Sequence, residues 1–433
     1  MTWDVDAVVA GGGVAGSSTA AALAALGWSV LIVEPGQHDD RRLSGELIHP
    51  AGVAGLARLG LLSSAFAAAA RLAGFVVLPD AEAPGGVHLP YRNGQAALAL
   101  DHAAICRSML ADVAALPRVS LARGWRVAGM ADIAGGAVVQ MRRGTTTEAV
   151  SCRLLVAADG ASSPVRCHAG LRHRRTRTAL LTGYLVDPAA LPVAGYGHVF
   201  SAAGGPVLAY AIGPDRARVL LNRALPRHGS HGEPATLPAC LPPRLRAEVE
   251  AASAAGAVQR FVSSDVAVTG VARGRVVLVG DAAGTCHPIS ASGMTMGIDD
   301  AIRLGQALRD RDGDIAASLA RYAAQRRPRQ RARVLLAALL HEVLGGAAAE
   351  MGMLRAGMHR YWSGNARART ASMALLAMDD PSVRSILLEV LRVAACGFVA
   401  SCGEPATLLH RSLLTVRLSR HVTRHLIGAL RVQ

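Results

Sequence analysis

Residues 5–16 read VDAVVAGGGVAG, an apolar run that ends in a cluster of glycines. The run Val5–Ala10 is typical of a buried parallel strand. An Ala- and Leu-rich helix is expected to follow it up to Gly27, and a second strand is expected at Ser29–Val33. This order of strand, turn, helix and strand predicts a parallel α/β unit at the start of the chain.

The glycines between the first strand and the helix fit the pattern G-x-G-x-x-G. Gly11 allows a tight turn, Gly13 lets the backbone approach a diphosphate, and Gly16 lets the helix pack against the strand. Free N–H groups at the helix N-terminus would then face the diphosphate, and Glu34 can accept hydrogen bonds from an adenosine ribose. The pattern predicts dinucleotide binding, with a plain Gly-rich turn as the alternative, and it does not distinguish FAD from NAD.

Two later apolar runs are each followed by an aspartate in a turn. Leu154–Ala157 leads into ADGASSPVR, which contains Asp159, and Arg275–Val279 leads into GDAAGTCHP, which contains Asp281. Either dipeptide alone, Asp-Gly or Gly-Asp, is an ordinary turn. Together, in this order after a nucleotide-binding start, they resemble the three-part fingerprint of group A FAD-dependent monooxygenases.

The resemblance to group A monooxygenases implies how the last part of the fingerprint holds a flavin. Asp281 would bond the region of the ribityl chain and the diphosphate. The turn after Pro288 would lead into a helix that begins near Gly293 and Met294. The N–H groups of that helix would face the N1–C2=O edge of the flavin, where negative charge gathers on reduction.

The composition is that of a folded protein rich in arginine. The 433 residues are enough for two or three domains, and 51% hydrophobic against 18% charged residues argues against disorder. All 46 basic residues are arginine, so P-loop lysines, Schiff-base lysines and the lysine of flavin-dependent halogenases are excluded. A net charge of +15 raises nucleic acid as a partner, but only 3% aromatic residues and no recognition motif argue against it.

The cysteines and the first residues of the chain bear on its location. The 7 cysteines are odd in number and form no C-x-x-C pair, which predicts neither a disulfide framework nor a zinc site. The acidic start, with Asp4 and Asp6, argues against a signal peptide. No apolar run approaches the roughly 18 residues of a membrane span. We expect a cytoplasmic protein, with peripheral attachment to the inner face of the membrane as the alternative.

The expected fold class is α/β, with a Rossmann-like FAD-binding domain of the p-hydroxybenzoate hydroxylase type. Short strand-like runs at 179–186, 206–212 and 218–221, together with 74–89, predict a mostly antiparallel sheet inserted into that domain. We expect an FAD-binding domain from residues 1–72, 92–174 and 262–325, a substrate-binding β-sheet domain from residues 73–91 and 175–261, and a C-terminal helical region from residues 326–433. The stretch 228–243 predicts a loop, and its His228 and His231 have no third ligand, so no metal site is predicted.

Helices are expected from about residue 315 onward, with breaks near residues 345–346, 379–381 and 402–403. A dense arginine run extends from Arg326 to Arg333. The last helix is amphipathic, with Arg417, Arg420, His421, Arg424, His425 and Arg431 on one face and Leu418, Val422, Leu426 and Leu430 on the other. It either packs on the domain with a solvated basic face or lies on an anionic membrane surface. The arginine run and this helix flank apolar helices, as expected for an enzyme that faces a membrane or acts on a lipid substrate.

Several segments resemble squalene epoxidases within the group A monooxygenases. Residues 42–52, RLSGELIHPAG, resemble the family's segment after the ribose-binding acid, and residues 281–297 resemble its flavin loop. Its middle-domain strands resemble residues 87–91 and 206–210. Its helical tail resembles residues 379–382 and 402–405. The similarity covers most of the chain, in order.

The fingerprint and this resemblance together imply a set of FAD contacts. They are Gly11, Gly13, Val14, Ala15, Gly16, Glu34, Arg42, Arg107, Val127, Asp159, Asp281, Pro288, Gly293 and Met294. Arg107 lies on a helix expected at His102–Ala115, from which its side chain can reach the diphosphate. For Arg42 and Arg107 a surface salt bridge is the alternative.

Two positions depart from the squalene epoxidase pattern. His49 stands where the family has a glutamine, and Phe75 stands where it has a tyrosine. Phe75 cannot donate a hydrogen bond, so the family's pair is not reproduced, which puts squalene itself in doubt as the substrate. His49, Phe75, Tyr184 and Tyr210 are the candidate substrate-binding residues, and His49 is also the candidate catalytic residue, with a purely structural histidine as the alternative.

The resemblance implies an oxygen transfer. Reduced FAD and O2 would form a flavin C4a-hydroperoxide that epoxidises a carbon–carbon double bond of a lipophilic terpenoid, prenylated or polyketide metabolite. NAD(P)H would supply electrons directly or through a separate reductase. The alternatives are hydroxylation or ring epoxidation of a phenol or quinolone with NAD(P)H, a prenyl-chain reductase, and a non-catalytic flavoprotein, against which the intact glycines, Glu34 and Asp281 argue.

Overall fold

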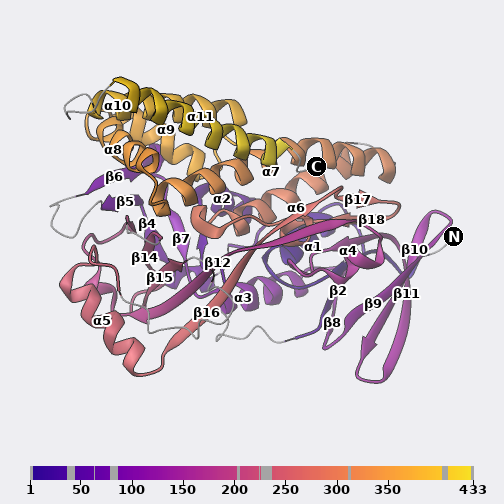
Figure 1. Ribbon diagram of the computed structural model, residues 1–433. Helices are drawn as coiled ribbons and strands as arrows, with labels where there is room; N and C mark the ends of the chain where they lie inside the picture. The colour runs from indigo at the N-terminus through magenta and orange to yellow at the C-terminus, as the bar shows by residue number, and fades with distance from the viewer. Residues whose placement is uncertain are drawn as a thin grey trace.

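The computed structural model describes residues 3–36, 44–62, 64–78, 86–201, 205–223, 225, 237–310, 314–401 and 408–430. An α/β unit carries the N-terminus, a second sheet lies beside it, and C-terminal helices lie along both (Figure 1). The predicted fold class is confirmed.

The first sheet is built around parallel strands, in the order β17-β18-β11-β1-β2-β8. Its strands are β1 (Val5–Ala10), β2 (Val30–Glu34), β8 (Val119–Arg123), β11 (Thr146–Ala157), β17 (Ala272–Arg273) and β18 (Val276–Leu278), and β9 (Arg126–Ile133) and β10 (Gly136–Arg143) extend β11 as an antiparallel ribbon. Ala7, Val8 and Val9 are fully buried. Because a central parallel strand is covered on both faces, the sequence of β1 is continuously apolar. Helix α1 (Val14–Ala24) packs against both α3 (His102–Ala114) and α6 (Gly293–Arg309) beside this sheet.

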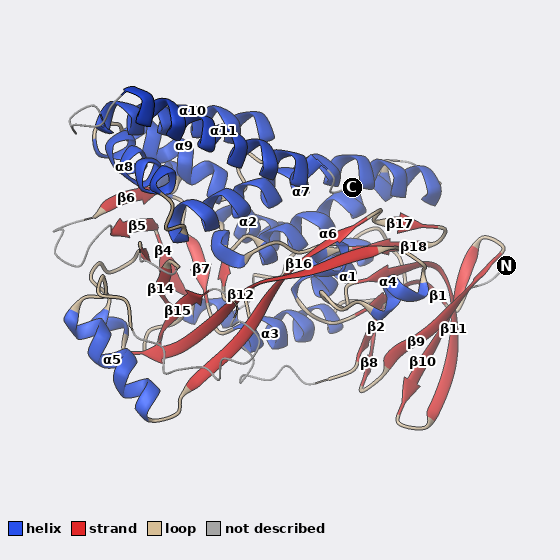
Figure 2. Cartoon of the chain, viewed as in Figure 1, coloured by secondary structure: helices blue, strands red, loops and turns tan. Residues whose placement is uncertain are grey.

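The second sheet has 7 strands in the order β16-β12-β15-β14-β13-β5-β6. They are β5 (Gly74–Leu78), β6 (Val87–Pro90), β12 (His173–Val186), β13 (Gly197–Phe200), β14 (Val207–Ala211), β15 (Ala217–Arg223) and β16 (Val258–Val268). Every pair is antiparallel except β13 with β5, so the predicted mostly antiparallel sheet is confirmed. The long strands β12 and β16 run from this sheet towards the first one (Figure 2).

Shorter elements complete the fold. They are α2 (Pro50–Arg58), α4 (Pro164–His168), α5 (Pro243–Ala254) and a small sheet of β3 (Leu47–Ile48), β7 (Ala97–Ala99) and β4 (Ala70–Leu72). Of these, α5 lies in the chain between two strands of the second sheet. The loop predicted at 228–243 ends where α5 begins, and His228 and His231 lie outside the described residues.

The C-terminal region consists of α7 (Ile315–Gly345), α8 (Ala349–Ser363), α9 (Ala366–Leu376), α10 (Val383–Ser401) and α11 (Leu408–Leu430). The predicted breaks near 345–346 and 379–381 are confirmed, and the one at 402–403 lies outside the described residues. In the part of the chain that the structure describes, no helix alone has the length and apolar composition to span a membrane. Only α7 and α8 together meet that measure, as a pair bent by 103°.

Part of the arginine run points into the protein rather than toward a surface. Arg326 is 1% exposed and its Nε lies 3.0 Å from Oδ1 of Asp300, while Nε of Arg329 lies 2.8 Å from Oδ2 of Asp299. Arg333 is buried as well. Because positions four and three residues apart share a helix face, these arginines form an inward row on α7. These three side chains therefore bind partners inside the protein and do not add to a basic surface beside the apolar helices.

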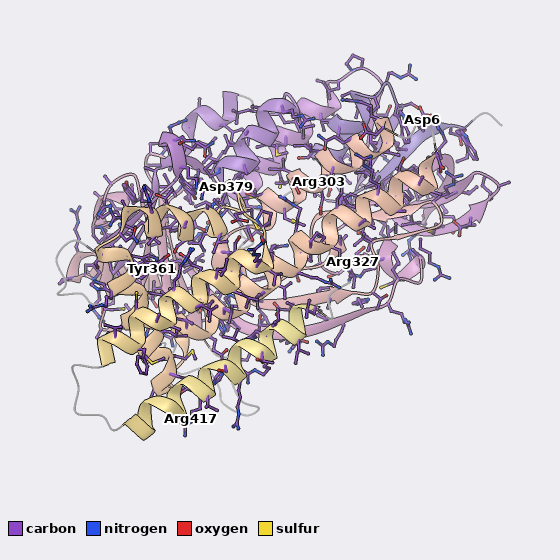
Figure 3. The ribbon with its side chains drawn as sticks, turned by 90° about the horizontal axis from the view of Figure 1, so that it is seen from above. Asp6, Arg303, Arg327, Tyr361, Asp379 and Arg417 are labelled. Atoms are coloured by element: carbon purple, nitrogen blue, oxygen red, sulfur yellow. The ribbon has the colours of Figure 1, made fainter. Side chains whose placement is uncertain are left out.

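Helix α11 packs on the protein through a face that includes its histidines. Nδ1 of His421 lies 2.7 Å from Oε1 of Glu342 on α7, and His425 pairs with the same carboxylate. The expectation that both histidines share the solvated basic face is wrong, because the Glu342 carboxylate holds them against α7. Arg417 does point outward (Figure 3), and Leu430, expected on the apolar face, is 49% exposed.

Candidate active site

The glycine-rich turn between β1 and α1 combines close packing with one opening. Gly11 has φ +101°, and a Cβ on Gly11 would lie 2.5 Å from the carbonyl oxygen of Ala158. A Cβ on Gly16 would lie 1.9 Å from the carbonyl oxygen of Gly11. In contrast, a Cβ on Gly13 would meet no atom within 4 Å. The turn thus leaves open space at Gly13, where the N-terminus of α1, beginning at Val14, presents free N–H groups to a diphosphate.

Glu34 stands at the end of β2 and faces this turn. Its Oε2 accepts a hydrogen bond from the Gly12 N–H at 2.6 Å, and its Oε1 accepts one from the Gly36 N–H at 3.0 Å. A carboxylate has about four acceptor sites, so capacity remains for the hydroxyls of a ribose. Val127 is buried on β9, which contacts β2.

Arg107 lies on α3 and its side chain is exposed. Leu110 of the same helix borders the glycine turn, since a Cβ on Gly12 would lie 2.9 Å from its side chain. This position fits the expected approach of Arg107 to a diphosphate. Arg42, expected in the same role, lies outside the described residues.

A buried arginine joins the two aspartate motifs. Oδ2 of Asp159 accepts a hydrogen bond from the Val165 N–H at 3.0 Å. The guanidinium of Arg166, 0% exposed, donates to the carbonyl oxygens of Ala161 and Ala282, both at 2.8 Å. Arg166 thereby fixes the turn after β11 against the turn after β18. Sequence reasoning missed this role, although Arg166 stands inside the quoted motif.

The turn after β18 leaves two side chains exposed in an otherwise buried stretch. Within residues 280–290 these are Asp281 and Pro288. The Cβ of Ala15 on α1 would lie 2.6 Å from a Cβ on Gly280 and 3.1 Å from one on Gly297. The fold therefore brings together the glycine turn, the Asp281 turn and the start of α6, as the fingerprint predicts.

The start of α6 is a second free helix N-terminus. Ser292 precedes it and its side chain makes no capping hydrogen bond to the helix, so the N–H groups of Gly293 and Met294 stay available. The Met294 side chain is buried, 3.7 Å from where a Cβ on Gly45 would lie.

The residues described so far fit FAD. The open space at Gly13 and the start of α1 suit its diphosphate, and Glu34 suits its adenosine ribose. The exposed Asp281 and Pro288, with the N-terminus of α6, suit the ribityl chain and the flavin ring.

His49 is buried between the flavin loop and the second sheet, with 1% of its surface exposed. Its Nε2 lies 2.8 Å from the carbonyl oxygen of Ser290, and its Nδ1 lies 2.7 Å from the hydroxyl of Tyr91. Because a carbonyl only accepts, Nε2 carries the proton and Nδ1 accepts from Tyr91. Burial lowers the pKa of His49 to about 4, so the ring is neutral. Both ring nitrogens bind protein atoms, which favours the structural role over contact with a substrate.

Tyr91 is the partner that sequence reasoning missed. It lies directly after β6, within the segment quoted for the resemblance, but nothing local links it to His49, 42 residues earlier. Phe75 and Tyr210 share one apolar cluster with Tyr91. Tyr184 belongs to another cluster, on a different part of the second sheet, so the structure does not bring it to His49.

A second long-range pair holds the His49 segment to the second sheet. The Arg218 guanidinium donates from Nε to Oε2 of Glu46 at 2.9 Å and from Nη2 to Oε1 at 2.6 Å, and both side chains are buried. Burial raises the pKa of Glu46, and Arg218 opposes that rise. The pair lies 172 residues apart and was not predicted.

The fold and the three converging motifs define an FAD-binding oxidoreductase of the group A monooxygenase type. Residues 4–337 match the family model described as "FAD binding domain", and the chain belongs to this family.

Similarity to known proteins points to monooxygenases within this family. The chain is 24% identical to rat (Rattus norvegicus) squalene monooxygenase over 407 residues, which cover 90% of this chain and 71% of that enzyme. It is 31% identical to the 6-methylpretetramide 4-monooxygenase of Streptomyces rimosus over 336 residues, 71% of this chain and 77% of that one. The structure of a Klebsiella pneumoniae HpxO variant complexed with FAD superposes with a TM-score of 0.69 at 23% identity, covering 90% of this chain and 99% of that one, and shows likeness of fold.

The chain spans 71%, 55% and 60% of the rat, mouse (Mus musculus) and ginseng (Panax ginseng) squalene monooxygenases that it matches. It is a squalene epoxidase-like, FAD-dependent monooxygenase.

Proposed function

We propose that the protein transfers one oxygen atom from O2 to a carbon–carbon double bond of a lipophilic terpenoid, prenylated or polyketide metabolite. The observation that carries this proposal is an apolar cavity of about 100 Å³, partly open to solvent and lined by helices α7 to α11. Its walls include Leu340, Met351, Trp362, Leu375 and Val393. Such a lining favours the binding of a hydrocarbon, and the flexible thioether side chain of Met351 can adapt to ligands of different shape.

The polar groups in the cavity wall are already bonded to one another. Nε1 of Trp362 donates to Oγ of Ser372 at 2.8 Å, and that hydroxyl donates to Oε1 of Glu389 at 2.5 Å. The wall therefore offers a ligand apolar contact rather than hydrogen bonds. This supports a substrate whose distal part is a plain hydrocarbon chain.

The cavity lies near the flavin loop. Arg333 on α7 borders Gly293, and the wall residues Leu336 and Leu340 follow on the same helix, about 5 Å and about 10 Å further along its axis. Cys286 of the flavin loop belongs to the same apolar cluster as Met351 and Trp362. A chain seated in the cavity would thus direct its double bond towards the flavin loop.

In this proposal the bound FAD supplies the activation of O2, with electrons from NAD(P)H, taken directly or through a separate reductase. The protein binds the chain, excludes water and holds the flavin loop. His49 and Tyr91 take part in the last task by fixing the carbonyl of Ser290.

The test is incubation of the FAD-loaded protein with isoprenoid and polyketide alkenes, NADPH, a flavodoxin- or ferredoxin-type reductase and ¹⁸O2, followed by mass spectrometry. We expect products that carry one ¹⁸O atom. The variant Leu340→Trp, which fills the cavity, should bind FAD normally and lose activity on long chains. A product that gains only hydrogen, also without oxygen, would identify a prenyl-chain reductase instead.

A second candidate function is hydroxylation of an aromatic polyketide. It is favoured by the 31% identity to a 6-methylpretetramide monooxygenase. In that case an aromatic substrate should stimulate NAD(P)H oxidation with no partner protein, and Leu340→Trp should have little effect.

A further inference from the structure

A buried cation lies at the N-terminus of α6. The Arg333 side chain is 5% exposed, and its Nε donates to Oγ of Ser292 at 3.1 Å. Its Nη1 donates to Oε1 of Gln330 at 3.4 Å, and its Nη2 lies 3.6 Å from where a Cβ on Gly293 would sit. Arg333 thus places a full positive charge beside the first residue of the helix.

This position is unfavourable for an arginine in the absence of an anion. A helix N-terminus already carries about half a positive charge, and cations are stabilising at the opposite end. A buried charge also requires a partner of opposite sign. Among the residues that the structure describes, no carboxylate oxygen lies within 4 Å of the Arg333 guanidinium.

Two further donors near Arg333 are buried and unpartnered. Nε2 of Gln330, whose side chain is 1% exposed, has no hydrogen-bond partner in the described structure. The same holds for Nε2 of His287, 4% exposed, which carries the ring proton because Nδ1 accepts from the Ile289 N–H at 3.2 Å. A fixed cation with spare donors around it matches a ligand that gains negative charge.

A counter-charge that interacts with Arg333 is Asp265, on β16. The His287 N–H favours its ionised form, and its buried Oδ1 has no hydrogen-bond partner in the described structure. Burial raises the pKa of Asp265 to about 6, and Arg333 opposes that rise.

The other ionisable groups of this cluster are Cys286, His287 and Asp281 of the flavin loop, and His341 on α7, whose ring centroid lies 4.2 Å from that of His287. Burial lowers the pKa of His341. Burial lowers the pKa of His287 to about 3 and raises that of Cys286 to about 11, so both side chains are neutral. Arg333 therefore supplies the fixed charge of this cluster, and Asp265 supplies the variable one.

We propose that Arg333 stabilises reduced over oxidised flavin by its charge at the start of α6, and that ionised Asp265 opposes it. Reduction places negative charge on the flavin edge that this helix end faces, so a cation there raises the reduction potential. Arg333 and Asp265 are tuning residues that act through space. The inference rests on the bound FAD and is independent of the substrate.

The experiment is spectroelectrochemical titration of the FAD-loaded protein between pH 5 and pH 8. In Arg333→Gln we expect reduced FAD to be bound at least tenfold less tightly relative to oxidised FAD, which for a two-electron couple is a drop of about 30 mV. Asp265→Asn should shift the potential in the opposite direction. As the pH falls through about 6, wild type should approach Asp265→Asn, because protonation removes the opposing charge.

Two controls accompany these variants. Arg327→Gln removes the same charge from the exposed side of α7 (Figure 3) and should leave the potential unchanged. Arg333→Lys keeps the positive charge, so its flavin reduction potential should stay close to that of wild type. The proposal is overturned if Arg333→Gln matches wild type, or if both charge variants shift the potential in one direction. If Arg333→Gln does not bind FAD, the test rests on Asp265→Asn alone. An unchanged flavin reduction potential in Asp265→Asn then refutes the proposal.

Discussion

At the scale of single residues, the glycine turn separates what the fold needs from what the cofactor needs. Gly16 has no room for a side chain, whereas Gly13 opens onto free space and has φ −73°, which any residue can adopt. Gly13→Ala should therefore leave the stability of the FAD-free protein within about 1 kcal/mol and weaken FAD binding at least tenfold, because the added methyl group occupies the diphosphate space. Urea unfolding and fluorescence titration with FAD measure the two effects.

Gly16→Ala is the matched substitution in the same turn. Its Cβ would lie 1.9 Å from a backbone oxygen, so we expect a loss of stability of about 3 kcal/mol or more before any FAD is added. Equal effects of the two substitutions on unfolding would contradict this division of roles.

His49 provides a second prediction at this scale. His49→Phe leaves the Ser290 carbonyl and the Tyr91 hydroxyl buried without partners, and each unsatisfied group costs about 1–3 kcal/mol. His49→Gln can still donate and accept, so it should retain most of the stability. Urea unfolding of both variants at pH 7 measures this difference. An equal loss of stability in both variants would mean that His49 does not stabilise the protein through its hydrogen bonds.

At the scale of elements, α7 is tied to the flavin loop by one buried ion pair. Asp300 accepts from the Gly280 N–H at 2.9 Å, and Nη1 of Arg326 donates to the carbonyl of Ala283 at 2.9 Å. Arg326→Met leaves the Asp300 carboxylate buried and unpaired, so we expect the free energy of unfolding to fall by about 3–5 kcal/mol and FAD binding to weaken.

The matched control for Arg326 is Arg303, which pairs with Asp299 one turn away at a partly exposed position (Figure 3). Arg303→Met should cost less than about 1 kcal/mol, because solvent screens that pair. Chemical denaturation of both variants measures the difference, and similar losses would mean that burial does not set the strength of these pairs.

Elements whose signal is local could be predicted from the sequence. The apolar run of β1, the glycine turn before α1 and the turns after β11 and β18 are each encoded by neighbouring residues, and the structure has β1, α1, β11 and β18 at these places. The partners of Arg326 and Arg218 could not be predicted, because Asp300 lies 26 residues and Glu46 lies 172 residues away in the chain. A single sequence shows a run of arginines, and only the packing of α7 shows which of them face inward.

At the scale of the whole molecule, neutral histidines are buried in the second sheet, at the start of α2 and in the flavin loop. Burial lowers the pKa of His49 and His198 to about 4 and that of His287 to about 3, against an ordinary value of 6.5. Each ring binds its proton in the unfolded chain at a pH where the folded chain excludes it. Stability is therefore fully present above about pH 6.5 and falls as the pH drops towards 4.

Buried carboxyl groups act in the opposite sense. Burial raises the pKa of Glu46 and Asp265, so the folded protein takes up their protons first and gains stability as the pH falls. Between pH 7 and pH 5 each buried histidine lowers the free energy of unfolding by about 2 kcal/mol, while Asp265 raises it by about 1 kcal/mol. The histidines dominate, and the free energy of unfolding should fall by about 2–5 kcal/mol over this range.

His198 offers a way to test this balance away from the flavin. It is fully buried in the second sheet, where Nε2 accepts from the Val193 N–H at 3.1 Å and Nδ1 donates to the Ala209 carbonyl at 3.2 Å. His198→Gln can make the same two hydrogen bonds without a titrating group. Urea unfolding at pH 7 and pH 5 should therefore show a loss about 2 kcal/mol smaller in the variant than in wild type. An equal loss in both proteins would mean that the unfolded chain does not gain the proton that buried His198 lacks.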